Sequence, residues 1–173
     1  MTLDGTVYGL RDATLIRMFD EGVPPPADLT GAVVLHMAPN VRRTPEGEYA
    51  PLSIGTTTSM RMDRFTRPLL ERHRVRAIIG KGGLGPDSLA AFREHGGAYL
   101  AITGGAAALE TVQIEAIEAV WWEDLMPECL WRFRVRRLGP LIVAMDAGGG
   151  DLYADVLAEA RSRLSGIYTR LGL

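Results

Sequence analysis

The sequence predicts a mixed α/β domain in which one central sheet is flanked by helices. Short apolar runs, several closing on glycine, alternate with segments whose apolar residues have helical spacing, a pattern typical of this class. The chain has 173 residues, of which 47% are hydrophobic and 23% are charged, so its length and composition suit one globular domain. No internal repeat or low-complexity segment is visible. We therefore expect one continuous core over residues 1–173.

In the first half of the chain, apolar runs and prolines mark the expected elements. They are, in order, a strand over 6–10, a helix from 12 to 22, a strand over 32–36, a proline-containing loop or hairpin, a short strand near 49–54 and a helical segment over 62–70. The first helix follows from the spacing of Leu15, Ile16 and Phe19 and must stop before the prolines at 24–26. Pro68 cannot lie inside a continuous helix, so we expect two short helical pieces there.

In the second half, a βαβ unit is followed by further strands and a terminal helix. The expected elements are a strand over 76–80, a helix over 87–95, a strand over 98–103, a helical stretch over 105–115, a strand over 131–135, a strand over 141–145 beside it, and one long helix over 151–171. Trp131, Phe133 and Val135 alternate with arginines, which indicates a strand with one face in water. Gly96 and Gly97 end the helix of the βαβ unit.

The charge balance and the N-terminus exclude several kinds of partner. With 19 basic and 21 acidic residues the formal net charge is -2, which argues against nucleic acid as a partner. The arginine-rich run at 132–137 is therefore interpreted as the solvated face of a strand. The first ten residues lack the features of a signal peptide, and glycines interrupt the most apolar stretch, 99–109. We expect a soluble, cytoplasmic protein with no membrane partner.

A single cysteine, Cys129, limits the metal chemistry of this chain. One thiol can neither form an intramolecular disulfide nor hold a zinc ion or an iron-sulfur cluster, because such sites need several thiolates or histidines. The sequence thus predicts no metal ligands in this chain. A metal cofactor, if used, would be held by another chain.

The segment GKGGLG, residues 80–85, satisfies the glycine pattern of dinucleotide-binding proteins between a strand and a helix. The following strand, however, ends in Ile102 and Thr103 instead of the acidic residue that binds the ribose, and Pro86 follows the last glycine. The Walker pattern fails as well, because neither serine nor threonine follows Lys81. A nucleotide-dependent enzyme is therefore the weakest of the alternatives.

Three features indicate an anion site, and each has a simpler alternative. Lys81 stands between glycines at a strand end, where backbone freedom and an ammonium group suit an anion; the alternative is an ordinary surface lysine. In the stretch 55–63, threonine hydroxyls and Arg61 meet a helix start and could receive a carboxylate; the alternative is N-capping by a threonine. Arg11 lies where a strand meets a helix; its alternative is a surface ion pair with Asp12 or Asp20. The histidines at 36, 73 and 95 are interpreted as structural or solvated.

Taken together, these features have the order and spacing of a known family. The matching segments are Arg11–Asp12, Thr57–Asp63, Gly80–Gly82 and Tyr99–Ala108, followed by Leu125, Glu128, the strand opening at Trp131, Pro140, Asp146 and Asp151–Tyr153. Over most of its length the chain resembles the C-terminal domain or beta subunit of class I fumarases and tartrate dehydratases.

The resemblance implies the swivelling β/β/α fold and the reversible dehydration of a 2-hydroxy dicarboxylate. It also implies a [4Fe-4S] cluster that is held by a separate alpha subunit, and a homodimer is expected from the family. Arg11, Arg61 and Lys81 match substrate-binding positions, and Thr58 is placed with them. Thr57 matches the threonine that assists proton transfer and is also assigned to substrate binding. An unactivated threonine is a poor base, so Thr57 needs a neighbouring charge or a partner residue.

Two departures from the family pattern leave an alternative open. Leu15 occupies a position that is commonly histidine, and the chain starts only ten residues before Arg11, so an additional upstream strand is expected to be missing or replaced by a partner. These changes could alter the preferred diacid. The alternative function is a non-catalytic anion-binding or scaffold paralogue of the same fold.

Overall fold

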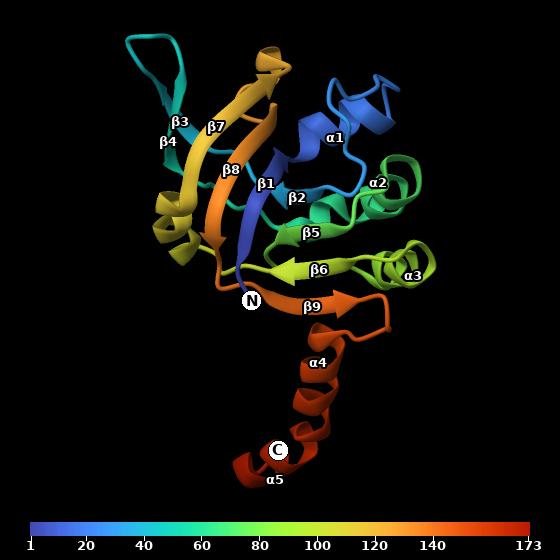
Figure 1. Cartoon of the computed structure of the whole chain (residues 1–173). Coiled ribbons are helices and arrows are strands. Elements are labelled where there is room, and N and C mark those ends of the chain that lie inside the picture. The colour runs from blue at the N-terminus through green and yellow to red at the C-terminus, as the bar shows by residue number, and fades with distance from the viewer.

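The computed structural model describes residues 1–105 and 108–173 in full. The Tyr99–Ala108 stretch that resembles the family and the helical stretch expected over 105–115 both include Ala106 and Ala107, which lie outside the described residues. The chain forms a seven-stranded sheet of order β7-β8-β1-β2-β5-β6-β9 and a separate two-stranded sheet, β3-β4 (Figure 1). The expected mixed α/β architecture with a central sheet and flanking helices is confirmed.

The bounds of the elements follow the sequence expectations over most of the chain. The strands are β1 Leu3–Leu10, β2 Val33–His36, β3 Asn40–Arg43, β4 Tyr49–Ser53, β5 Ala77–Gly80, β6 Ala98–Ala101, β7 Ile114–Trp121, β8 Leu130–Leu138 and β9 Ile142–Asp146. The helices are α1 Asp12–Phe19, α2 Thr66–His73, α3 Pro86–His95, α4 Leu152–Ser162 and α5 Leu164–Leu171, with 3₁₀ helices η1 Ser59–Phe65, η2 Ala106–Gln113 and η3 Glu123–Leu125. The division around Pro68 is confirmed, because η1 ends and α2 begins just before this proline.

Four neighbouring strands, β1, β2, β5 and β6, run parallel and form the middle of the sheet. β8 and β9 flank them in the antiparallel direction. Helices α1, α2 and α3 lie on one side of the sheet, and β3, β4 and η2 lie on the other (Figure 1). Alternate residues of a strand point to opposite faces, so Val34 and Ile78 pack beneath the helices while Leu35 and Ile79 pack on the other side. The carboxyl ends of all four parallel strands therefore meet at one edge of the sheet.

Strand β7 was not expected from the sequence, which predicted a helical stretch over 105–115. The helix is the 3₁₀ segment η2, and from Ile114 the chain pairs with β8 instead. The pairing of β7 with β8 shifts register at two places, and its exposed and partly buried residues do not alternate regularly. These irregularities remove the period of two by which an edge strand is recognised.

The expectation that the 141–145 strand lies beside the 131–135 strand was wrong. β9 pairs antiparallel with β6, at the edge of the sheet farthest from β7. The backbone of Leu141 exchanges two hydrogen bonds with Met1, at 2.7 and 2.8 Å, so the connection after β8 passes the start of β1 and continues to the β6 edge. A short connection usually joins adjacent antiparallel strands, whereas the connection after β8 passes β1 and leads to the opposite edge of the sheet, where β9 pairs with β6.

The long helix expected over 151–171 is divided into α4 and α5 at Arg163. Asp151 caps α4, since its side-chain oxygen accepts the amide hydrogens of Tyr153 and Ala154 at 3.0 Å each. Both helices extend away from the sheet (Figure 1), and no residue of either is buried. Within the described part of the chain, no helix is long and apolar enough to cross a membrane.

Candidate functional site

The predicted site residues lie at the edge where the parallel strands end. Arg11 follows β1 directly and precedes α1, Lys81 follows β5, and Thr57, Thr58 and Arg61 lie where the chain returns from the β3-β4 hairpin into η1. Loops at the carboxyl ends of parallel strands are the usual ligand sites of such sheets. The fold therefore brings residues from three separate segments to one place.

Arg61 connects the threonine segment to the start of α1. Its Nη2 atom donates to a carboxylate oxygen of Asp12 at 3.0 Å and to the hydroxyl of Thr57 at 2.8 Å. Arg11 Nε donates to the same oxygen of Asp12 at 3.1 Å. One carboxylate thus bridges two arginines, and the ion pair between Arg11 and Asp12 considered from the sequence is present. Asp20 pairs with Arg64 instead.

The charges within this cluster stabilise one another. The hydrogen bond from Arg61, followed by that from Arg11, lowers the pKa of Asp12 below its ordinary value against the opposing effect of burial. The same hydrogen bond raises the pKa of Arg61. Both groups are therefore charged at neutral pH. The side chain of Arg61 remains 49% exposed, so its guanidinium can still be reached from solvent.

Glu128, in the loop before β8, is a second carboxylate that contacts Nε of Arg11. Its carboxylate lies 3.2 Å from Arg11 Nε and accepts the backbone amide of Ala13 at 2.8 Å, while its backbone carbonyl accepts the hydroxyl of Thr14. A carboxylate that accepts this amide hydrogen stabilises the N-terminus of α1. Asp12 and Glu128 were not predicted as site residues, although both stand in the segments that resemble the family.

Thr57 and Thr58 contact Arg61 and Lys81, and neither side chain caps the helix that follows them. Thr57 is only 8% exposed, and its hydroxyl accepts the hydrogen bond from Arg61. Thr58 occupies the N-cap position of η1, but no side-chain hydrogen bond caps this helix. Thr58 instead forms a parallel β-bridge with Lys81. Simple N-capping thus does not account for these threonines.

Lys81 reaches from the end of β5 towards the loop after β6. A Cβ atom added to Gly104 would lie 3.1 Å from Cδ of Lys81 and 3.6 Å from its Nζ, so the lysine stem runs along this glycine. Lys81 is half-buried and forms no ion pair with the side chains that the structure describes. Among the described residues, its ammonium thus differs from the guanidinium groups of Arg11 and Arg61, which both pair with carboxylates.

The glycines of GKGGLG are explained by the turn and not by a nucleotide. Gly82 and Gly83 have positive φ angles of 79° and 74°, which favour glycine. Asp63 occupies the N-terminus of α3, because its Oδ1 accepts the amide of Gly85 and the hydroxyl of Ser88, both at 2.6 Å. A pyrophosphate would need the position that this carboxylate fills. This geometry argues against the nucleotide alternative.

Leu15, which replaces a histidine common in the family, is fully buried in the core beneath α1. This position therefore contributes apolar packing to the domain and presents no polar group to the site.

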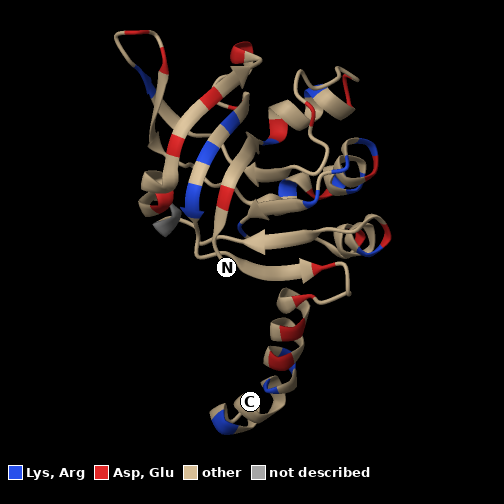
Figure 2. Ribbon diagram, viewed as in Figure 1, with Lys and Arg blue, Asp and Glu red and all other residues tan. Residues whose placement is uncertain are grey.

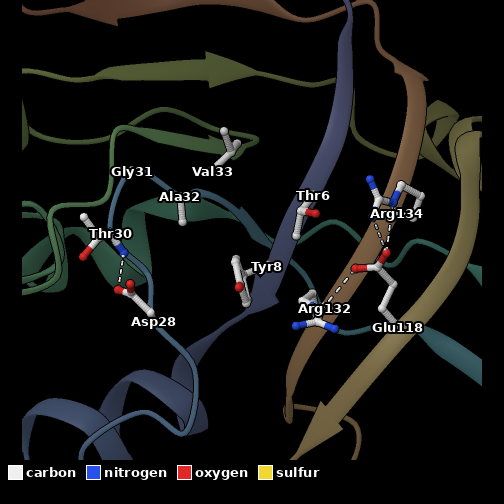
Figure 3. A pocket seen from close by; sticks show the side chains of 10 residues that line it. All are labelled: Thr6, Tyr8, Asp28, Thr30, Gly31, Ala32, Val33, Glu118, Arg132 and Arg134. Atoms are coloured by element: carbon white, nitrogen blue, oxygen red, sulfur yellow. Dashed lines mark hydrogen bonds and ion pairs between the residues drawn. The ribbon is translucent and has the colours of Figure 1, made fainter.

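A separate open pocket of about 510 Å³ lies over β1 and β8, away from the predicted site residues (Figure 3). Its two arginines, Arg132 and Arg134, contact Glu118 at 3.2 and 2.8 Å, and this carboxylate offsets part of their positive charge. Figure 2 shows acidic residues on β7 beside basic residues on the neighbouring strand β8. The arginine run is thus part of the solvated strand face expected from the sequence, and the structure adds its ion pairs with Glu118.

In the portion that the structure describes, no three His, Cys, Asp or Glu side chains are arranged to hold a metal ion. Cys129 is buried, and burial raises the pKa of its thiol to about 11, so it stays protonated at neutral pH.

Several known proteins are similar to this chain over most of its length. The family model described as "Fumarase C-terminus" matches residues 1–156. The beta subunit of L(+)-tartrate dehydratase from Escherichia coli (strain K12) is 38% identical over 163 residues, which cover 92% of this chain and 81% of the relative. A putative L(+)-tartrate dehydratase beta subunit from Methanocaldococcus jannaschii is 33% identical, with 94% and 86% covered. A putative class I fumarate hydratase from Geobacillus stearothermophilus is 34% identical over 94% of this chain and 31% of its own length. Because these matches span most of its length, the chain belongs to the fumarase C-terminus family.

Proposed function

We propose that this chain is the beta subunit of an iron-sulfur hydro-lyase that reversibly dehydrates a 2-hydroxy dicarboxylate, malate to fumarate or tartrate to oxaloacetate. The observation that carries the proposal is the convergence of Arg11, Arg61, Lys81 and Thr57 at the carboxyl edge of the sheet. Relatives of the same length class are tartrate dehydratase beta subunits, and a longer relative is a putative fumarate hydratase. These names support hydro-lyase activity as a subunit.

The cations suit a substrate with two carboxylates. Arg61 presents a half-exposed guanidinium, and a guanidinium can bind a carboxylate through two parallel hydrogen bonds. Lys81, directly after the end of β5, adds a positive point charge. Arg11, held between Asp12 and Glu128, sets the position of α1 and supplies a third positive group. Several fixed cations orient the diacid, which lowers the entropic part of the barrier.

Thr57 is placed to move a proton at the carbon beside the departing hydroxyl. The guanidinium of Arg61 donates to its hydroxyl oxygen at 2.8 Å. A fixed cation at this oxygen stabilises negative charge that develops there, which is the neighbouring charge a threonine needs. Thr57 is nearly buried, so water competes little for this hydrogen bond.

The family depends on an iron-sulfur cluster, and we assign the [4Fe-4S] cluster to an alpha subunit. When bound, its open iron would act as a Lewis acid on the departing hydroxyl. This chain has one cysteine, which is buried and protonated, so its residues do not fit a cluster. The designation beta subunit in the relatives implies an alpha partner. The putative fumarate hydratase is much longer than the region matched here, as expected if both parts of the site lie on one chain there.

We further propose a cytoplasmic location and a homodimeric arrangement of this chain. A free, unoxidised cysteine suits a reducing compartment, and the homodimer is an expectation from the family.

The experiment that tests the function is anaerobic co-expression with the cysteine-bearing alpha subunit, which we expect to be encoded beside this chain. Dehydration of malate and of both chiral tartrates is measured for each chain alone, for the pair, and for the pair carrying Lys81→Ala. We expect activity only from the pair and its collapse in the variant. If no complex forms and no diacid is dehydrated, the scaffold alternative replaces this proposal.

A further inference from the structure

Beneath the site lies a buried chain of three polar side chains. The hydroxyl of Tyr99 donates to Ser59 Oγ at 3.0 Å, and Ser59 Oγ lies 3.0 Å from Nδ1 of His36. All three residues are fully buried. They come from β6, η1 and β2, so the network joins three segments far apart in the sequence.

From this network we infer which ring nitrogen of His36 carries the proton. Since Tyr99 donates to Ser59, the serine hydroxyl is free to donate its own proton to Nδ1 of His36. Burial lowers the pKa of His36 to about 3, so the ring is neutral and carries its single proton on Nε2. Nε2 has no hydrogen-bond partner in the described part of the chain. The ring thus accepts at Nδ1 and leaves a buried donor unpaired.

The network is directly connected to the backbone of the site. The amide of Thr57 donates to the carbonyl of His36 at 2.9 Å, and the amide of Ser59 donates to the carbonyl of Lys81 at 2.8 Å. His36 and Ser59 therefore hold the segment that contains Thr57, and Ser59 also holds Lys81.

The space around Ser59 shows how tightly this arrangement is built. A Cβ atom on Gly80 would lie 1.9 Å from Ser59 Oγ and 3.2 Å from the hydroxyl of Tyr99. Only glycine fits at the end of β5, because the serine hydroxyl occupies the side-chain position. The glycine before Lys81 is thus required by the buried network.

We propose that His36, through Ser59, is a positioning residue that sets the placement of Thr57 and Lys81 in the hydro-lyase site. This inference rests on the proposed function. An apolar side chain of similar size would fill the same volume without leaving an unpaired donor, so packing alone does not explain a buried histidine here. What the ring supplies is an acceptor that fixes the serine hydroxyl, and with it the turn from Thr57 to Ser59.

The test uses variants of the alpha-beta complex. His36→Leu removes the acceptor, and His36→Asn retains one near the position of Nδ1. Tyr99→Phe keeps the ring but removes the donor to Ser59. We expect His36→Leu to lower kcat on the order of ten- to a hundred-fold, because misplacement of a reacting group affects the chemical step most. His36→Asn should recover most of kcat, and Tyr99→Phe should lie between them.

Activity is expressed per folded complex, so lower stability alone would not produce this pattern. If His36→Leu keeps the wild-type kcat, the positioning role is overturned. The same holds if the kcat of His36→Asn is no higher than that of His36→Leu. If the wild-type complex itself has no dehydratase activity, the proposed function fails first.

A second readout does not depend on activity. In full-length chain labelled with ¹⁵N at histidine, two-bond ¹H-¹⁵N correlation spectra report which ring nitrogen carries the proton. We expect His36 to be protonated on Nε2 and to remain neutral from pH 8 down to about pH 5. Protonation on Nδ1, or charging within that range, would overturn the network on which the inference depends.

Discussion

The hydroxyl of Thr57 lies 2.8 Å from Nη2 of Arg61, four residues later in the chain. The same guanidinium nitrogen binds Asp12 at 3.0 Å, so one arginine connects the threonine to the start of α1. The orientation of Thr57 therefore depends on a carboxylate that is distant in the sequence. The predictions below separate this arrangement from the ordinary ion pairs of the surface.

Arg61→Ala is expected to lower kcat/KM of the alpha-beta complex by about 100-fold, because it removes a substrate cation and the donor to Thr57. The matched control is Arg64→Ala, in the same helix η1, where the arginine pairs with Asp20 outside the site. Steady-state kinetics with malate and tartrate measure the difference. Equal losses in the two variants would contradict the assignment of Arg61.

Thr57→Val keeps the shape of the side chain and removes its hydroxyl. We expect kcat to fall on the order of 100- to 1,000-fold while the complex still forms, because proton transfer loses its positioned group. Thr57→Ser restores the hydroxyl and should recover activity to within about ten-fold of wild type. A Val variant as active as the Ser variant would remove Thr57 from the reaction.

The ion pair of Asp12 should make a pH-dependent contribution to stability. Arg61 lowers the folded-state pKa of Asp12 below its unfolded value of 3.8, so the contribution is complete above that value and is lost as pH falls through the folded-state pKa. Urea unfolding should therefore give wild type a free energy of unfolding about 1 kcal/mol higher than that of Asp12→Asn at every pH from 5 to 7. The difference should shrink below about pH 4. A constant difference down to pH 2 would contradict this linkage.

Asp63→Ala should lower the free energy of unfolding by about 1–2 kcal/mol, because the amide of Gly85 and the hydroxyl of Ser88 lose their shared acceptor. Asp87→Ala is the control, since this exposed carboxylate stands in the first turn of the same helix.

The melting temperature of wild type should not shift when NAD or ATP is added. A clear upward shift would revive the nucleotide alternative.

Much of the fold could be predicted because its signals are local. Buried parallel strands are continuous apolar runs, so those ending at His36 and Gly80 could be recognised from the sequence. β7 could not, since its bulged pairing with β8 disturbs the alternation that marks an edge strand. The place of β9 was also missed, because the contact of Leu141 with Met1 joins residues 140 positions apart in the sequence.

For the site, the sequence by itself determined which groups are available: an arginine after the first strand, threonines and an arginine before a helix, and a lysine between glycines. It also determined that one cysteine cannot hold a cluster. Only the tertiary structure decided that Asp12 bridges Arg11 and Arg61, that Asp63 fills the N-terminus of α3, and that His36 lies buried against Ser59. The reason is physical: residue types and spacing set local conformation and charge, whereas hydrogen bonds between residues 22 to 49 positions apart exist only after the sheet has brought the strand ends together.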